Sequence, residues 1–240
     1  MPDERAAVTD GRRIAFRGAA CAAGVAGLVG TTAQSLSQPG PAEFWIYFTF
    51  QSNLLLAVFF GVLVGREVRG AGEPGPFLRG AKGAVTLYIL ITGLVFNLLL
   101  ANPASPFYTV QKDSHYLWYS VLLHVVAPVM ALLDWLMFGP RGSLRWRHAA
   151  MWLAYPLAYL AFALIRGAVV TTGTLYPYPF LDVAKSGYGQ VTVNCCALAV
   201  AFWLLGVGLV ALDRRAAGRG GDEVAVAEDV PAPTAVSRRR

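Results

Sequence analysis

Six stretches of this chain are each long and apolar enough to cross a lipid bilayer as a helix. A bilayer-spanning helix needs about 20 mostly apolar residues, with a usual range of about 17–25. The stretches are residues 14–32, 44–64, 83–101, 116–138, 149–171 and 188–212. Overall, 56% of the residues are hydrophobic and 14% are charged. In soluble domains about 45–50% of the residues are apolar and about 25% are charged. The sequence therefore predicts an all-α, polytopic integral membrane protein with six transmembrane helices.

The positions of the basic residues predict how these helices are oriented. Apart from Lys112, Lys185 and Arg166, every Lys and Arg lies in or beside the N-terminal segment, the second loop, the fourth loop or the C-terminal tail. Because cytoplasmic loops carry the excess of Lys and Arg, both termini are expected to be cytoplasmic. The net charge of +6 is thus explained by orientation, and no nucleic-acid partner is predicted.

The expected organisation has three parts. They are a cytoplasmic N-terminal segment (1–13), a six-helix transmembrane domain (14–212) and a disordered cytoplasmic tail (213–240). The first hydrophobic stretch also fits a cleaved secretory signal peptide, but its removal would leave five spans and place one basic end outside. The abundance of Ala, Gly and Arg is typical of a GC-rich bacterial genome, so the expected location is the cytoplasmic membrane.

The sequence contains no pattern that predicts a metal site or a cofactor. Two of its three histidines, His115 and His148, lie in opposite loops, which leaves His124 without a second axial ligand for haem. No HExxH, CxxC or paired-carboxylate pattern is present. All three cysteines fall inside predicted spans, so no disulfide framework is indicated. We therefore expect neither a metal nor a cofactor.

Polar side chains recur at one depth in five of the six predicted spans. With a rise of about 1.5 Å per residue, Thr49 lies about 8 Å below the outer end of the second span, and His124 about 12 Å below that of the fourth. Asn97 and Arg166 lie near the outer ends of the third and fifth spans, and Asn194 lies near that of the sixth. Because polar side chains in membranes face a bundle interior or a water-filled cavity, the sequence predicts one outward-opening polar pocket.

Helical spacing selects further residues for this pocket. Thr49, Ser52 and Asn53 share one helix face, and Ser120, His124 and Pro128 form a stripe in which the proline is expected to kink the helix. The predicted catalytic residues are Thr49 and His124, and the predicted substrate-binding residues are Ser52, Asn53, Asn97, Arg166, Asn194 and Tyr159.

A hydroxyl and an imidazole are the minimum for nucleophilic catalysis, since a neutral histidine can take the hydroxyl proton during attack on a carbonyl. Ser52, Asn53 or Asn194 could donate hydrogen bonds to the oxyanion, and Arg166 suits a substrate carboxylate. A pocket in the outer leaflet favours a lipid or fatty-acyl ester as substrate, surrounded by membrane lipids.

Each of these residues also has a structural alternative. The asparagines could join helices, Arg166 could extend to the outer surface, and the imidazole could be a hydrogen-bonded residue of the bundle. The pocket as a whole could equally serve a non-catalytic lipid-binding or small-molecule carrier protein. The oligomeric state is not predicted.

Three segments resemble the signatures of a known family. FTFQSNLLL contains Thr49, HVVAPVMALLD contains His124, Pro128 and Asp134, and YPYPFLD ends at Asp182. In this order and at these intervals they resemble the androgen-induced and androgen-dependent transmembrane proteins, in a bacterial six-pass form. The resemblance implies a membrane threonine hydrolase of fatty acid esters of hydroxy fatty acids, with Thr49 as nucleophile and His124 as general base. It also implies that YPYPFLD caps the pocket on the outer side.

The chain departs from the animal members of that family in two respects. The QSN run after Phe50 is absent from them, which puts the identity of the ester in doubt. Arg166 matches none of their functional residues, so its expected role as a carboxylate ligand depends on depth and charge alone.

Overall fold

A computed structural model describes residues 2–110, 117–139 and 142–228, and these residues contain no strand. The α-helices are α1 (Pro2–Ser37), α2 (Phe48–Val68), α3 (Pro76–Val95), α4 (Trp118–Val121), α5 (Ala127–Phe138), α6 (Trp146–Met151), α7 (Ala154–Val169) and α8 (Val183–Glu228). The π-helical turns are η2 (Phe96–Leu100) and η4 (Leu122–Val126), and the 3-10 turns are η1 (Phe44–Ile46) and η5 (Pro179–Leu181).

Six helical segments of the described chain are long and apolar enough to span a membrane, so the predicted all-α, polytopic architecture is confirmed. They are Gly11–Ser37, Phe48–Val68, Pro76–Leu100, Trp118–Phe138, Trp146–Val169 and Val183–Ala217. The third joins α3 to η2, the fourth joins α4, η4 and α5, and the fifth joins α6 to α7. Each lies close to a stretch expected from hydropathy.

The second span begins later than the sequence predicts. Phe44–Ile46 forms the separate turn η1, and Tyr47 has an extended backbone (φ −81°, ψ 137°), so α2 begins at Phe48 and not at residue 44. Thr49 is therefore the second residue of its helix. The predicted start of the fourth span, Tyr116, lies outside the described residues.

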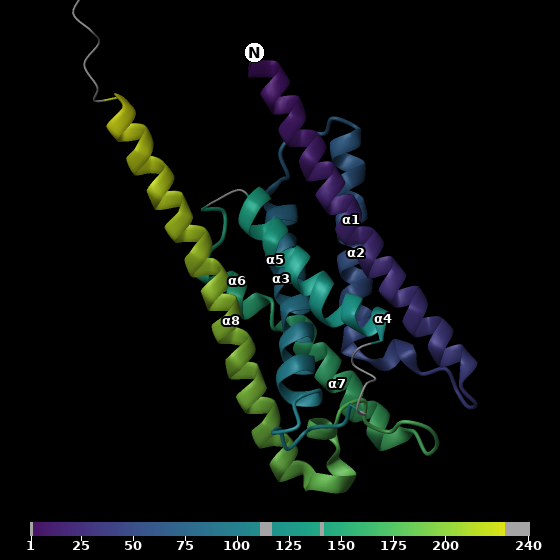
Figure 1. Ribbon diagram of the computed structural model, residues 1–240. Coiled ribbons are helices and arrows are strands. Elements are labelled where there is room, and N and C mark those ends of the chain that lie inside the picture. Colours follow the sequence, from purple (N-terminus) through teal and green to yellow (C-terminus); the bar gives the residue numbers. More distant parts are fainter. Residues whose placement is uncertain (1, 111–116, 140–141, 229–240) are drawn as a thin grey trace, which may run out of the picture.

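The helices form one elongated bundle in which α3 is central (Figure 1). α1 packs along α2, while α3 contacts α2, α5 and α8. The N-terminal part of α1 and the C-terminal part of α8 lie at the same end of the bundle (Figure 1), where the loop between α2 and α3 also lies. We call this the basic end, because Arg13, Arg66 and Arg79 are found there. The start of α2 lies at the opposite end, which we call the site end.

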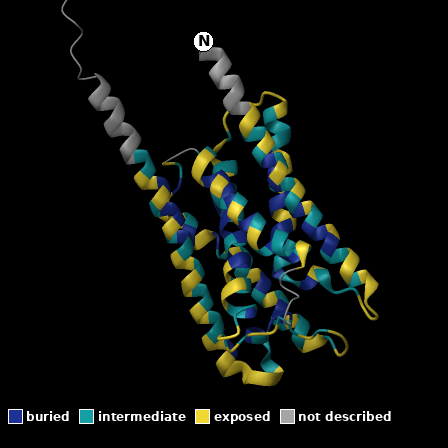
Figure 2. Cartoon of the chain, in the orientation of Figure 1, coloured by how far each residue is buried: buried dark blue, intermediate teal, exposed yellow. Residues whose placement is uncertain are grey.

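Two buried clusters hold the bundle together. One contains Leu87, Trp152 and Phe180 and joins α3 to α6, α8 and the loop before α8. The other contains Leu56, Ile89 and Ala127 and joins α2, α3 and α5, with Ala20 of α1 beside them. Exposed residues recur along α8 (Figure 2), and they include large apolar side chains such as Trp203. Apolar exposure of this kind fits a surface that faces lipid.

The last helix continues past the boundary expected from the sequence. α8 runs to Glu228, whereas the sequence predicts disorder from residue 213. At that boundary Asp213 is buried and accepts a hydrogen bond from the backbone N–H of Leu144 (2.9 Å), so the helix is still packed against the bundle there. Beyond residue 213, several alanines favour the helical state. The remainder of the predicted tail, residues 229–240, lies outside the described residues.

Candidate functional site

The structure brings Thr49 and His124 together from different spans. Thr49 Oγ1 lies 3.3 Å from His124 Nε2. Thr49 belongs to the first turn of α2, and His124 lies in the π-turn η4, in the first half of the fourth span. Both side chains are half-buried. Two residues 75 positions apart therefore form a hydroxyl–imidazole pair that a substrate can reach.

The other ring nitrogen of the histidine fixes which tautomer is present. His124 Nδ1 lies 2.9 Å from the carbonyl oxygen of Ser120 and 3.2 Å from the Ser120 hydroxyl. A carbonyl oxygen only accepts, so Nδ1 carries the proton and donates it. Nε2 then presents its lone pair to the Thr49 hydroxyl. This is the tautomer that a general base requires, and Ser120 supplies the group that orients it.

A π-helical turn and a proline change the backbone around His124. The N–H of Ala127 donates to the carbonyl of Leu122, five residues earlier. Pro128 has no N–H that could donate to the carbonyl of His124, four residues earlier. Two asparagines supply donors to carbonyl groups at this point. Asn97 Nδ2 donates to the His124 carbonyl (3.1 Å).

The second asparagine acts on both helices of the pair. Asn53 Nδ2 donates to the Leu123 carbonyl (3.4 Å) and to the Thr49 carbonyl (2.9 Å). It is fully buried, so it joins α2 to η4 within the bundle. The two helices that carry the hydroxyl and the imidazole are thus held in register by a neutral hydrogen bond.

Close packing also holds the imidazole from a third helix. A Cβ atom on Gly93 of α3 would lie 2.9 Å from Pro128 Cγ and 3.1 Å from the His124 carbonyl oxygen, so only glycine allows α3 to approach this closely. Phe96 stacks on the His124 ring with a centroid distance of 3.6 Å. Free rotation of the imidazole is therefore prevented on one face.

Tyr178 is the third polar side chain at Thr49. The Thr49 backbone N–H, which has no partner within its own helix at this position, donates to the Tyr178 hydroxyl oxygen (3.4 Å). Burial raises the pKa of Tyr178 to about 12, although its hydrogen bonds with Thr49 act in the opposite direction. The phenol is therefore protonated at neutral pH, and its O–H can donate to a negative oxygen beside Thr49.

Two cavities meet at Thr49. The outer one has a volume of about 480 Å³ and is lined by both members of the pair, by Tyr178 and by Thr31. The other has a volume of about 90 Å³ and is lined mostly by apolar side chains of α3, α7 and α8. Thr49, Phe96, Leu100 and Tyr178 belong to both linings. The Thr49 hydroxyl therefore lies between a cavity lined by both polar and apolar side chains and a cavity lined mostly by apolar ones.

The other residues predicted for the pocket serve mainly to join segments. Ser52 Oγ bonds with Thr92 Oγ1 (2.7 Å), and the Tyr159 hydroxyl donates to the Ile46 carbonyl (2.9 Å). Asn194 Nδ2 donates to the Phe180 carbonyl (3.2 Å). The amide donors of Asn53 and Asn97 are bonded to backbone as well. Ser52, Asn53 and Asn194 line neither cavity at Thr49, so the structure does not support the expectation that one of them stabilises an oxyanion.

Arg166 also differs from expectation. Its guanidinium forms an ion pair with Glu43 (2.5 Å) and donates from Nε to the Thr174 carbonyl (3.2 Å). The guanidinium that was expected to bind a substrate carboxylate thus binds the carboxylate of Glu43 instead. Glu43 further accepts the N–H of Thr174 (2.8 Å). Through their bonds to Thr174, Arg166 and Glu43 together hold the loop that carries Tyr178 in place.

The Glu43–Arg166 pair makes a pH-dependent contribution to stability. Burial raises the pKa of the Glu43 carboxyl, but hydrogen bonds from Thr174 and the charge of Arg166 lower it by more, so it lies below its ordinary 4.5. A depressed folded-state pKa stabilises the protein above the unfolded-state value and loses this effect as the pH falls through the folded-state value. We expect the difference in melting temperature between wild type and Glu43→Gln to shrink below pH 4.5.

Thermal unfolding in detergent from about pH 3 to about pH 7, a range that brackets the ordinary pKa of a glutamate, measures the difference. Glu73→Gln is the control, because Glu73 is exposed and lies at the basic end. A difference that stays constant across the range would contradict the assignment.

Two groups at this site have roles that the sequence did not indicate. The Ser120 carbonyl orients the histidine, for which the only sequence signal is the i, i+4 spacing of Ser120 and His124. The Tyr178 hydroxyl contacts the threonine from a distant loop, and only its place in YPYPFLD points to it. No group of three or more His, Cys, Asp or Glu side chains positioned to hold a metal ion occurs within the described part of the chain.

Comparisons with protein-family models, with curated proteins and with solved structures gave no match to this chain.

Proposed function

We propose that this protein is an intramembrane lipid-ester hydrolase in which Thr49 is the nucleophile and His124 the general base. One observation carries the proposal: the Nε2 lone pair of a histidine faces the Thr49 hydroxyl at 3.3 Å, while Nδ1 is bound to a carbonyl oxygen. A structural hydrogen bond would not require this tautomer. The resemblance of the three segments to membrane threonine hydrolases points to the same two residues.

In the first step His124 Nε2 takes the proton from Thr49 Oγ1 as this oxygen attacks the ester carbonyl carbon. The resulting tetrahedral oxyanion accepts a hydrogen bond from the Tyr178 hydroxyl. Negative charge beside Thr49 is also stabilised by the N-terminal end of α2, where the helix dipole is positive. The C–O bond to the alcohol breaks, the alcohol leaves with the proton from His124, and an acyl-Thr49 ester remains.

Water completes the cycle. His124 takes a proton from a water molecule as its oxygen attacks the acyl-Thr49 carbonyl. The second tetrahedral intermediate collapses, the fatty acid leaves, and Thr49 Oγ1 recovers its proton from His124. The wider outer cavity, with its hydroxyl-bearing side chains, is where water can reach the ester.

The two cavities support a substrate with two unlike parts. The apolar cavity between α3, α7 and α8 suits an acyl chain, and the larger outer cavity suits the alcohol part of the ester. Fatty acid esters of hydroxy fatty acids have this form. We place the protein in the cytoplasmic membrane with the site end facing outward, on the basis of the Lys and Arg distribution.

Covalent trapping tests the proposal. Purified protein in detergent is treated with a fluorophosphonate probe, and the modified peptide is located by mass spectrometry. We expect modification of Thr49, and its loss in His124→Ala, because the base activates the hydroxyl. Thr31→Ala, which changes another threonine of the same outer cavity, is expected to label like wild type.

Hydrolysis of an ester panel, from simple acyl esters to fatty acid esters of hydroxy fatty acids, is measured on the same preparations. Absence of both labelling and turnover would favour a lipid-binding or carrier protein that uses the same cavities. Labelling that persists in His124→Ala would remove the histidine from its role as base.

A further inference from the structure

A separate cavity lies at the basic end of the bundle, opposite the Thr49 site. It has a volume of about 380 Å³ and is enclosed by α1, the end of α2, the start of α3, the loop between them, and Phe138 of α5. Its charged lining residues are Arg13, Arg17, Arg66, Glu67, Glu73, Arg79 and Lys82. Nothing in the ester chemistry uses this cavity, so it requires its own explanation.

The charges around the cavity do not balance. Five cationic side chains line it, against the two carboxylates of Glu67 and Glu73. Asp134 lies behind the lining and pairs with Arg17 and Lys82, so among the described residues two more cationic than anionic groups remain. Arg17 and Lys82 are only 4% and 7% exposed. Because these two buried cations are paired with Asp134, the excess falls on Arg66 and Arg79, which are half-buried and whose charge a bound anion would stabilise.

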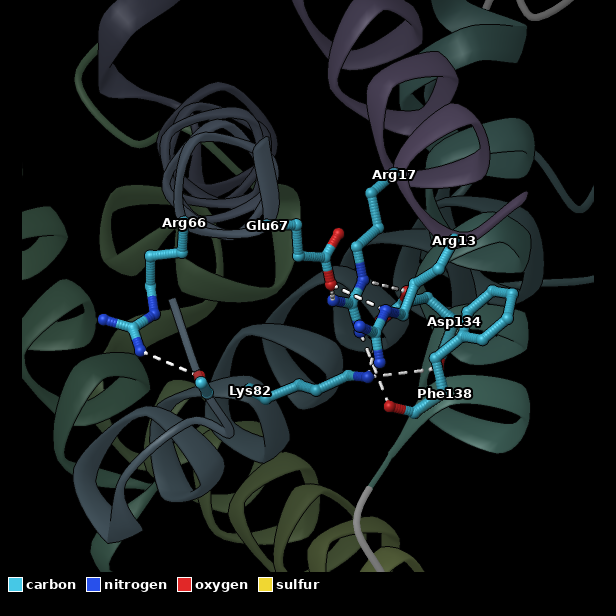
Figure 3. A network of polar contacts seen from close by, with 8 residues as sticks. Arg13, Arg17, Arg66, Glu67, Lys82, Asp134 and Phe138 are labelled. Carbon is cyan, nitrogen blue, oxygen red and sulfur yellow. Dashed lines mark hydrogen bonds and ion pairs between the residues drawn. The ribbon is translucent and has the colours of Figure 1, made fainter. Parts of the chain in front are cut away.

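One wall of the cavity is held rigid by ion pairs (Figure 3). Arg17 Nε lies 2.7 Å from Asp134 Oδ1, and Lys82 Nζ lies 2.6 Å from Asp134 Oδ2. Glu67 pairs with Arg17 and, at 2.8 Å, with Arg13. These contacts come from four different helices, so the cationic groups are fixed before any ligand arrives.

The other wall consists of two arginines that are bonded to the loop. Arg66 Nη2 donates to the Gly72 carbonyl (3.2 Å), and Arg79 Nε donates to the Pro74 carbonyl (2.7 Å). Each thus commits one nitrogen of its guanidinium to the backbone, and Figure 3 shows Arg66 apart from the ion-paired side chains. A guanidinium has five N–H donors arranged in a planar fork that matches phosphate oxygens.

We propose that this cavity binds an anionic phosphate group, with Arg66 and Arg79 as its direct ligands and the buried wall of Arg17 and Lys82 as electrostatic support. The group belongs either to an anionic phospholipid headgroup or to a soluble phosphate. Basic pockets between transmembrane helices on the cytoplasmic side are suited to anionic headgroups. Ile14 and Leu63 also line the cavity, and they give a lipid's glycerol and acyl parts an apolar surface.

The test compares wild type with the double variant Arg66→Gln/Arg79→Gln. Protein is reconstituted in nanodiscs of phosphatidylcholine alone or with phosphatidylglycerol, and melting temperature and lipid affinity are measured. A second arm adds inorganic phosphate at constant ionic strength. The control is Arg12→Gln/Arg69→Gln, which removes the same charge from exposed residues at the same end that do not line the cavity.

We expect phosphatidylglycerol to raise the melting temperature of wild type and control, and the double variant to bind it about tenfold or more weakly. Stabilisation by phosphatidylglycerol alone identifies a headgroup site, whereas stabilisation by inorganic phosphate as well identifies a site for a soluble phosphate. An equal response in all three proteins, or no response in wild type, would overturn the proposal. Because ester hydrolysis is not the readout, the result is independent of the proposed function.

Discussion

His124→Ala is expected to lower kcat/KM for ester hydrolysis by about 10³-fold, in line with the contribution of about 10²–10⁴-fold from general acid–base catalysis. Thr49→Ala is expected to lower it at least as far, since no acyl-enzyme can form. The double variant should be no worse than the more impaired single variant, because the two residues act as a unit. Steady-state kinetics on the best ester of the panel, in detergent, measures all three.

Thr31→Ala is the matched control, because Thr31 lines the same outer cavity and has no role in the proposed chemistry. Tyr178→Phe adds a separate test of the oxyanion assignment. Loss of an oxyanion donor costs about 10²–10³-fold in kcat, and we expect KM to change little. Turnover that survives both Thr49→Ala and His124→Ala would refute the threonine mechanism altogether.

Asp134→Ala is expected to cause the largest loss of stability, about 3–5 kcal/mol in the free energy of unfolding. The Asp134 side chain is fully buried and pairs with Arg17 and Lys82, which are themselves buried. Removing the carboxylate therefore takes a shared counter-charge away from two buried cations, of which Arg17 still pairs with Glu67. Denaturant or thermal unfolding in detergent, followed by circular dichroism, measures the loss.

Asp182→Asn is the control for this substitution. Asp182 is half-buried and accepts the N–H of Lys185 (3.0 Å) at the start of α8, and asparagine can cap a helix as well as aspartate, so the substitution is expected to cost no more than about 1 kcal/mol. The triple variant Asp134→Leu/Arg17→Met/Lys82→Met should recover much of the lost stability, because it replaces the buried ions by apolar side chains. An Asp134→Ala protein as stable as the control would show that the ion pairs contribute nothing.

The six spans were predictable because hydropathy is a local property. A run of about 20 apolar residues has few alternatives to a membrane helix, and the described spans lie close to those expected. The start of α2 was not predictable in the same way. Phe44, Trp45 and Ile46 are as apolar as the helix that follows, and only the contacts of the folded protein, such as the Tyr159 hydroxyl with the Ile46 carbonyl, separate them from it.

The central pair of the candidate site was predictable, but its other members and their arrangement were not. Thr49 and His124 were found because polar residues are rare in spans, and because two short segments resemble a family. The bonds of the asparagines were not found, since they depend on carbonyl groups of a different helix. Arg166 was assigned to a substrate because its partner, Glu43, lies 123 positions away in a loop for which no role was predicted.

The π-turn around His124 also restricts how the gene can change. A π-turn contains one residue more than an α-turn, so deleting one codon within residues 122–126 would leave an uninterrupted α-helix that is no less apolar. The α-helical segments on either side would keep their relative orientation, because the π-turn is what accommodates the additional residue. His124 lies within this turn, so the deletion would alter the backbone that carries the imidazole while the two flanking segments stay in place.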